Sequence, residues 1–174
     1  MLMLVGLLLS IVQLAGATVP PVAWTIAGSD AGGGAGIQAD LHTFQALGVH
    51  GCSAITALTA QNSVEVRMVE YPSLEFLRTT LAALRDDLPA RAIKLGMLGS
   101  RGVVAEVASF LATLEEVDHS ASGGPLVVCD PVMVTTSGSR LLDADATAAL
   151  TADLFPRCRL ITPNLVEAEA LLGR

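Results

Sequence analysis

The alternation of two kinds of apolar segment constrains the fold of this 174-residue chain more than any other feature. Short runs of aliphatic and β-branched residues, typical of buried strands, alternate with stretches in which apolar residues recur every three or four positions. This order predicts a three-layer α/β/α fold with a mainly parallel sheet, right-handed crossovers and helices on both faces. Strands are predicted at residues 22–27, 51–58, 64–70, 92–98, 125–129 and 159–161, and helices at apolar stripes from Ile37, Leu74 and Val104 and at residues 143–154 and 164–172.

One predicted strand differs from the others. In residues 64–70, Val64, Val66 and Met68 alternate with Glu65 and Arg67. A period of two is typical of a strand with one exposed face. We therefore expect a half-exposed strand at the edge of the sheet.

Composition narrows the classes of protein further. Hydrophobic residues make up 52% of the chain but aromatic residues only 3%, which favours a parallel sheet buried between helices over an all-β sandwich. The net charge is −7 and no basic run occurs, so we expect no nucleic-acid partner.

Cys52, Cys129 and Cys158 are far apart in the sequence and form no CxxC pair. They indicate neither a zinc site nor a disulfide framework, and are typical of buried thiols in a reducing compartment.

Residues 1–21 form an apolar leader without a charged side chain. Ala15, Gly16 and Ala17 resemble a cleavage site, but the positive charge that starts a signal peptide is missing. Ser10, Gln13 and the prolines interrupt the run before it reaches the length of a membrane span. Two interpretations stay open, namely a targeting or anchor segment and an incorrectly assigned start. We therefore base the predicted fold on residue 22 onward.

Polar or glycine residues come at the ends of five predicted strands. They are Asp30, Gln61, the Gly96-Met97 pair, Asp130 and Asn164. Ligands bind at the carboxyl edge of open α/β sheets. The pattern therefore predicts a site at this edge.

The glycine-rich segment between the first strand and helix allows two interpretations. It is no Walker A loop, because no Lys-Ser/Thr pair follows the Gly32-Gly33-Gly34 run, and Ile37 breaks a G-x-G-x-x-G pattern. It is either a flexible turn or a loop whose N–H groups approach a ligand at a helix N-terminus. Asp40, early in that helix, either accepts hydrogen bonds from a ligand amine or hydroxyl or reflects a simple preference for acidic residues there.

Four segments together carry a specific resemblance: AGSDAGGGAGIQADLHTFQALGVHGCSAITALTAQN, KLGML, CDPVMVTTSG and LITPNLVEAEALL. In this order and spacing the chain resembles the hydroxymethylpyrimidine/phosphomethylpyrimidine kinases of the ribokinase superfamily. The resemblance implies that residues 22–174 form the N-terminal portion of a ribokinase-like kinase domain. It also implies phosphorylation of 4-amino-5-hydroxymethyl-2-methylpyrimidine, its phosphate, or both in thiamine biosynthesis, with ATP and Mg²⁺ as cofactors.

The resemblance assigns roles to residues in the substrate pocket. Asp40 and Gln61 correspond to family residues that hydrogen-bond the aminopyrimidine ring and its substituents. Met97 is also a candidate for plain core packing. The remaining expected substrate-binding positions are Gly28, Asp30, Ala35, Met97 and Val132.

A second group is expected on the phosphate side. Asp130 resembles the acidic residue near magnesium and the phosphates, although Asp130-Pro131 is also typical of a turn after a strand. Asn164 and Glu167 match the superfamily's N-x-x-E, in which the glutamate acts on magnesium through water. The same pair before an apolar helix also predicts a capping box. We therefore expect Asp130 and Glu167 to be the residues nearest the metal.

The chain also departs from the family pattern. Ala31 and Gly32 replace a common Pro-Ser, His42 replaces a common Lys, and Thr136 lies where some relatives have Lys. The family's Gly-Thr-Gly-Cys-type catalytic loop has no counterpart, so no catalytic residue is assigned and little kinase activity is expected of these 174 residues alone.

Alternative functions follow from the same features. A pyridoxal/pyridoxine-type kinase is the nearest, and a truncated, inactive fragment that retains only the substrate half-site is the second. A generic flavodoxin-like binding domain is the third. We expect a small-molecule substrate, membrane contact only through the leader, and a cytoplasmic location, or a plastid or other organelle if the leader is a targeting segment. A homodimer is left open.

Overall fold

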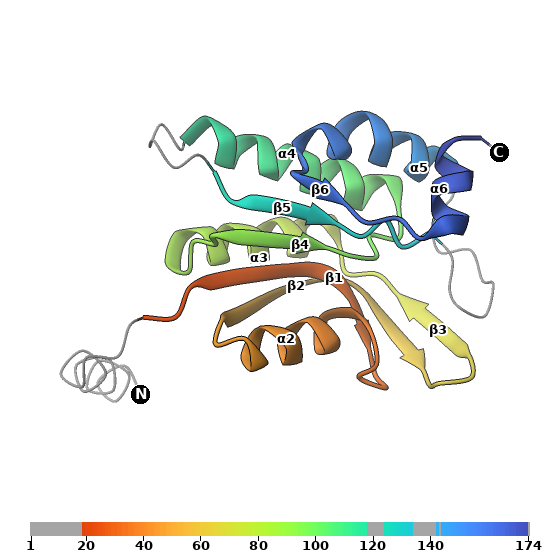
Figure 1. The fold of residues 1–174 in the computed structure, drawn as a ribbon, viewed down its shortest axis with the longest axis horizontal. Helices are drawn as coiled ribbons and strands as arrows, with labels where there is room; N and C mark the ends of the chain where they lie inside the picture. Colours follow the sequence, from red (N-terminus) through yellow and green to blue (C-terminus); the bar gives the residue numbers. More distant parts are fainter. Residues whose placement is uncertain (1–18, 118–123, 134–141, 143, 174) are drawn as a thin grey trace.

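The computed structural model describes residues 19–117, 124–133, 142 and 144–173, and its sheet has the strand order β3-β2-β1-β4-β5-β6 (Figure 1). The strands are β1 (Val22–Asp30), β2 (His50–Gln61), β3 (Val66–Glu70), β4 (Ala92–Leu95), β5 (Leu126–Cys129) and β6 (Leu160–Ile161). The helices are α2 (Gly36–Ala46), α3 (Leu74–Asp87), α4 (Arg101–Val117), α5 (Ala144–Ala149) and α6 (Leu165–Leu171), with a π-helical turn η1 (Leu150–Leu154) and a 3-10 turn η2 (Phe155–Arg157) after α5.

The sheet is parallel except at one edge. β1 pairs in parallel with β2 and β4, and the parallel pairing continues through β5 to β6. Only β3, next to β2, is antiparallel. Helices cover both faces, with α2 in front of the sheet and α3 behind it in Figure 1. The predicted three-layer fold with a mainly parallel sheet is confirmed.

The two faces of β1 serve different purposes, because successive side chains of a strand point to opposite faces. Trp24 and Ile26 are buried in a core cluster together with Leu81 of α3 and Val107 of α4. Between them, Thr25 hydrogen-bonds to α2, which packs against the other face. The main core therefore lies on the α3 and α4 side, and polar groups are buried on the α2 side.

Several predicted strand ends were wrong. Gly28 does not end β1, which continues until Asp30 pairs with Thr59. Ala27 pairs with Ile55 and Ser29 with Leu58, so β2 has one extra residue opposite Gly28 and carries a β-bulge there. β2 likewise extends to Gln61, whereas β4 ends at Leu95 and not at residue 98. A bulge disrupts the ladder only locally, so pairing with β2 resumes and β1 carries Asp30 to the carboxyl edge of the sheet.

β3 lies at the edge of the sheet, as predicted, but its side chains do not alternate between buried and exposed as predicted. Gln61 pairs with Val66 and Ala60 with Met68, so Arg67 is the extra residue of a β-bulge. The bulge destroys the expected alternation. Val64, before the strand, is 79% exposed and Met68 is 61% exposed.

The helix predicted at residues 143–154 was wrong as a single α-helix. Its first residue lies outside the described ranges, α5 ends at Ala149, and η1 and η2 follow. Pro156 in η2 has no N–H for a continuing helix, which favours a change of direction toward β6.

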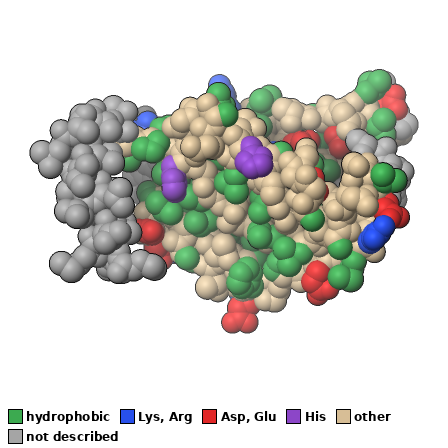
Figure 2. All heavy atoms as spheres, turned by 90° about the horizontal axis from the view of Figure 1, so that it is seen from below, with side chains coloured by type: hydrophobic (Ala, Val, Ile, Leu, Met, Phe, Trp, Pro, Cys, Tyr) green, Lys and Arg blue, Asp and Glu red, His purple; other side chains and the backbone are tan. Residues whose placement is uncertain are grey.

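The leader lies outside the described residues up to residue 18, and so does the predicted surface loop at residues 118–123. Of the helices that the structure describes, none has the length and apolar character needed to cross a membrane. On the face seen in Figure 2, the described Lys and Arg side chains lie apart from one another.

The three cysteines are free thiols, as expected, but two of them meet. Cys52 and Cys129 are buried and Cys158 is half-buried. Hydrogen bonding with Cys158, together with burial, raises the pKa of the Cys129 thiol. Cys129 ends β5 and Cys158 precedes β6, so sheet pairing joins residues that are distant in sequence.

Candidate functional site

A pocket of about 760 Å³ opens at the carboxyl edge of the sheet. All seven residues expected to bind substrate line it, and Asp130 joins them from the end of β5. Their contacts with a ligand stay a prediction, because no ligand is present. The expected residues in the lining are Gly28, Asp30, Ala35, Asp40, Gln61, Met97, Asp130 and Val132.

The glycine-rich turn is organised around the Asp30 side chain. Oδ1 accepts a hydrogen bond from the Gly32 N–H at 2.8 Å, and Oδ2 accepts from the N–H groups of Gly34 at 3.0 Å and Ala35 at 2.9 Å. The Gly33 N–H donates to the Asp30 carbonyl oxygen. The turn therefore wraps around an internal carboxylate, and its N–H groups are already occupied.

This arrangement also sets the charge state of Asp30. Burial acts to raise its pKa, but hydrogen bonds from the Gln61 side chain and the turn N–H groups outweigh it. The pKa of Asp30 therefore lies below its ordinary value, because these donors favour the charged form. The carboxylate is an ionised structural anchor at the mouth of the pocket.

Two residues that were not predicted from the sequence, Gln38 and Gly36, hold the end of β1 against the start of α2. The Gln38 side chain accepts from the Asp30 N–H at 2.8 Å and donates to the Ser29 hydroxyl at 2.7 Å. Gly36 has φ of 58°, and a Cβ there would collide with the Gly28 carbonyl oxygen. Only glycine tolerates both conditions.

The Asp40 carboxylate is held by two further residues. Its Oδ2 accepts from the Thr25 hydroxyl at 2.6 Å and from the Lys94 ammonium at 2.9 Å. The side chains of Lys94 and Asp40 are only 26% and 17% exposed. Neither Thr25 nor Lys94 was predicted. A signal existed, because Lys94 is the only lysine in the chain and lies between Ile93 and Leu95 in an apolar strand.

Asp130 follows β5, and its N–H donates to the Leu95 carbonyl at 2.9 Å. Burial raises its pKa, and the nearby Glu167 and Asp40 carboxylates add to the shift while Lys94 opposes it. The pocket therefore holds more negative than positive charge around Asp130.

Glu167 is buried but is absent from the pocket lining. Its Oε2 accepts from the Asn164 N–H at 2.9 Å, and the Asn164 side chain accepts from the Glu167 N–H at 3.0 Å. This is the capping box expected as the alternative role. The other oxygen, Oε1, accepts from the Met133 N–H at 3.2 Å.

The metal assignment stays a prediction. In the part of the chain that the structure describes, no group of three or more His, Cys, Asp or Glu side chains is placed to hold a metal ion. Thr136, which bears on a phosphate contact, lies outside the described residues.

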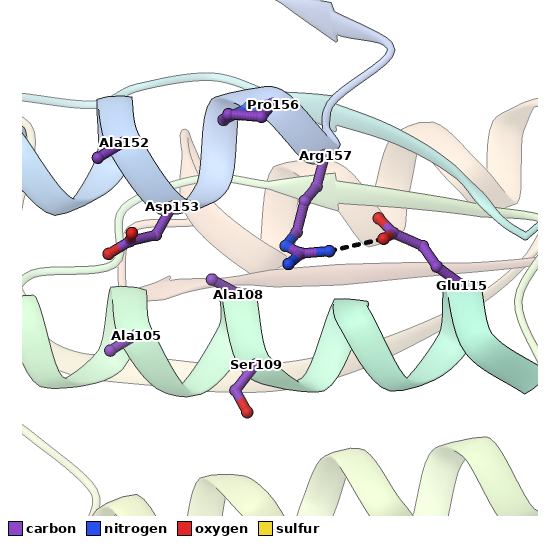
Figure 3. Close-up of a pocket in the computed structure, with 8 residues that line it drawn as sticks. All are labelled: Ala105, Ala108, Ser109, Glu115, Ala152, Asp153, Pro156 and Arg157. Carbon is purple, nitrogen blue, oxygen red and sulfur yellow. Dashed lines mark hydrogen bonds and ion pairs between the residues drawn. The ribbon is translucent and has the colours of Figure 1, made fainter.

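A second hollow of about 470 Å³ lies between α4 and the η1–η2 segment (Figure 3). Arg157 reaches across it to Glu115, with a 2.6 Å ion pair. Ala105, Ala108 and Ala152 form much of the lining. No residue predicted from the sequence lies there, so the pocket at the sheet edge is the candidate site.

Comparison with known proteins decides the family. The sequence model of one family, described as phosphomethylpyrimidine kinase, matches residues 30–174. The chain belongs to the phosphomethylpyrimidine kinase family. The hydroxymethylpyrimidine/phosphomethylpyrimidine kinase of Rhizobium meliloti is 48% identical over 153 residues, which are 88% of this chain and 54% of the relative. The Bacillus subtilis kinase of the same name is 47% identical over 87% of this chain and 53% of its own length.

Solved structures agree with this family and with the ribokinase-like fold. Phosphomethylpyrimidine kinase from Clostridium difficile has a TM-score of 0.78 and 41% identity, covering 88% of this chain and 63% of that one. Pyridoxal kinase from Staphylococcus aureus, solved with pyridoxal, has a TM-score of 0.75 and 31% identity over 90% of this chain and 55% of its own. The chain spans about half the length of the curated relatives that it matches.

Proposed function

We propose that this chain provides the alcohol-binding side of an ATP-dependent kinase acting on 4-amino-5-hydroxymethyl-2-methylpyrimidine, its phosphate, or both. One observation carries the proposal. The Asp40 carboxylate, anchored by Thr25 and Lys94, and the Gln61 amide line the same pocket at the carboxyl edge of the sheet. A carboxylate and an amide together match an aminopyrimidine, which offers an amine donor next to a ring-nitrogen acceptor.

The residues that line the pocket suit a small ring. Met97 and Val132 provide apolar lining, and residues of the turn around Asp30 also line the pocket. Apolar walls with a few fixed polar groups are typical of small-molecule sites. Held in this way, the ring would present its hydroxymethyl group toward the Asp130 end of the pocket.

ATP would be the phosphoryl donor. Its use is supported by the family, and a Staphylococcus aureus pyridoxal kinase has been solved with AMP-PCP and pyridoxal. Phosphoryl transfer depends on positioning and charge neutralisation more than on covalent help from the protein. In this chain, Asp40 and Gln61 would orient the alcohol, while Asp130 would lie near the phosphates of ATP.

Magnesium would bind on the Asp130 side of the pocket. Burial, together with the Glu167 and Asp40 carboxylates, raises the pKa of Asp130, so a cation bound beside it would favour its charged form. Both Glu167 oxygens already accept backbone N–H groups, which fits action on the ion through water. When bound, Mg²⁺ would neutralise charge on the transferring phosphate.

A pyridoxal-type kinase is the second candidate. The likeness to the pyridoxal kinase of Staphylococcus aureus, at 31% identity and a TM-score of 0.75, is the observation that favours it. The two substrates differ in the polar edge of the ring, where Asp40 and Gln61 would make their contacts.

Calorimetric titration of the purified chain with the pyrimidine alcohol and, separately, with pyridoxine tests the proposal. We expect the pyrimidine alcohol to bind more tightly. Equal or tighter binding of pyridoxine would favour the second candidate, and binding of neither would contradict both. ATP turnover is measured in a separate assay, because the chain spans about half the length of its relatives.

The cellular location belongs to the same proposal. Free cysteines fit a reducing compartment, and the proposed reaction consumes ATP. We therefore infer a cytoplasmic location, with an organelle as the alternative if the leader is a targeting segment.

A further inference from the structure

Two donors from neighbouring strands converge on a single oxygen of Asp40. Thr25 of β1 and Lys94 of β4 are partners across the parallel ladder, so their side chains lie next to each other on the α2 face. Both donate to Oδ2, at 2.6 and 2.9 Å. For the other oxygen, Oδ1, the described residues provide no hydrogen bond. One half of the carboxylate is therefore anchored, and the other half is available to the pocket that Asp40 lines.

The backbone leaves room for Lys94 at this position. A Cβ at Gly96 would come within 3.0 Å of the Lys94 Nζ and 2.9 Å of the Ala27 Cβ. The missing side chain at Gly96 thus lets the ammonium reach Asp40.

Lys94 also acts on a second acidic group of the same pocket. It pairs directly with Asp40, and its charge acts against the upward shift of the Asp130 pKa caused by burial and by the Glu167 and Asp40 carboxylates. Lys94, Asp40 and Asp130 all line the pocket. Lys94 is the one Lys or Arg among the described residues that line the pocket, so removing it would leave both carboxylates without a cation in that lining.

We infer that Lys94 is a positioning residue for the substrate pocket: with Thr25 it anchors Oδ2 of Asp40 so that Oδ1 is directed at the ligand. Lys94 acts through Asp40 and makes no ligand contact of its own. The inference rests on the proposed function, since it takes the ligand to be the aminopyrimidine alcohol.

Binding measurements on three single variants test this inference. The probe is the pyrimidine alcohol, titrated into the full chain by calorimetry. Lys94→Met removes the charge while keeping an unbranched side chain, and we expect about tenfold weaker binding or worse, as for loss of a charged hydrogen bond. Lys94→Arg keeps the charge and should restore part of the affinity. Arg78→Met, which removes the cation of an exposed ion pair with Glu106, is the matched control and should bind like the wild type.

A double-variant cycle separates positioning from direct contact. In an Asp40→Asn background, Lys94→Met should weaken binding no further, because the anchored oxygen has lost its charge. A further loss of similar size in that background would show that Lys94 touches the ligand, and would overturn the inference. Unchanged binding by Lys94→Met alone would overturn it too. A melting curve for each variant confirms that the protein is folded at the temperature of the titration.

The single lysine provides a readout that does not depend on affinity. Acetylation of Lys94, followed by peptide mass spectrometry, should be slower when the pyrimidine alcohol fills the pocket and faster in Asp40→Asn, which releases the ammonium. Acetylation that is equally fast in Asp40→Asn and the wild type would contradict the anchoring. If the wild type fails to bind the pyrimidine at all, the proposed function falls and the inference with it. If it binds but Lys94→Met is unchanged, only the inference falls.

Discussion

The Asp30 carboxylate takes the place in the glycine-rich turn that a bound anion takes in a phosphate-binding loop. Three turn N–H groups donate to its two oxygens, and Gln61 also donates to it. Turns of successive N–H groups attract anions. Here the chain supplies its own anion, so the turn is a preformed wall for a substrate and not a cradle for a phosphate.

Asp30→Asn tests this role through the pH dependence of stability. Asparagine has one acceptor oxygen without charge, so we expect the free energy of unfolding to fall by about 1–3 kcal/mol at neutral pH. The native pKa lies below the unfolded value, so the contribution of the carboxylate is complete above about pH 4 and is lost as pH falls through the native pKa. Urea unfolding at several pH values should show the difference between wild type and variant narrowing in acid. A constant difference would contradict the anchoring role of the charge.

Asp130 should behave in the opposite way. Its native pKa is raised, so between about pH 4 and that value the native state binds more protons than the unfolded state, and stability falls as pH rises. Asp130→Asn cannot ionise. We therefore expect its melting temperature to exceed that of the wild type at neutral pH, with the gain disappearing in acid. A variant less stable than the wild type at neutral pH would contradict the view that burial and neighbouring carboxylates make the Asp130 charge unfavourable.

At the scale of elements, the junction of β1 and α2 positions most of the pocket. β1 runs past a bulge of β2 after Ala27 and ends at Asp30, the turn folds back, and α2 starts at Gly36 against the Gly28 carbonyl. Gln38 ties the start of the helix to the end of the strand. The helix then places Asp40 over Thr25.

Gly36→Ala should break this junction, and Gly34→Ala is its control. Gly36 has positive φ and no room for a Cβ, so we expect a loss of about 3 kcal/mol of stability. At Gly34, φ is not positive, and a Cβ would only meet Asp30 Oδ2 at 3.7 Å, an ordinary contact. Its substitution should change stability by less than about 1 kcal/mol. Equal losses on urea unfolding would contradict the assigned role of Gly36.

The sequence predicted the order of elements and the edge of the sheet that forms the site, because both follow from periodicity and from where polar residues interrupt apolar runs. It did not predict the bulges in β2 and β3, since a bulge depends on pairing with a neighbouring strand. It also missed Thr25 and Lys94. Their role arises from lateral pairing of β1 with β4, which no local pattern reveals.

At the scale of the whole molecule, family membership and pocket geometry point the same way. The family match covers residues 30–174, and all seven expected substrate-binding residues line one pocket. The residues assigned to the phosphate side do not all line this pocket. Asp130 lines the pocket, whereas Glu167 and Asn164 form the cap of α6.

The central claim is that the pocket around Asp40 binds the aminopyrimidine alcohol. Calorimetric titration of 4-amino-5-hydroxymethyl-2-methylpyrimidine into the wild type, Asp40→Asn and the surface control Asp86→Asn tests it most directly. We expect saturable binding by the wild type and the control, and at least about tenfold weaker binding by Asp40→Asn with the fold retained, as judged by circular dichroism. Equal affinity in Asp40→Asn and the wild type, or no binding by a folded wild type, would contradict the claim.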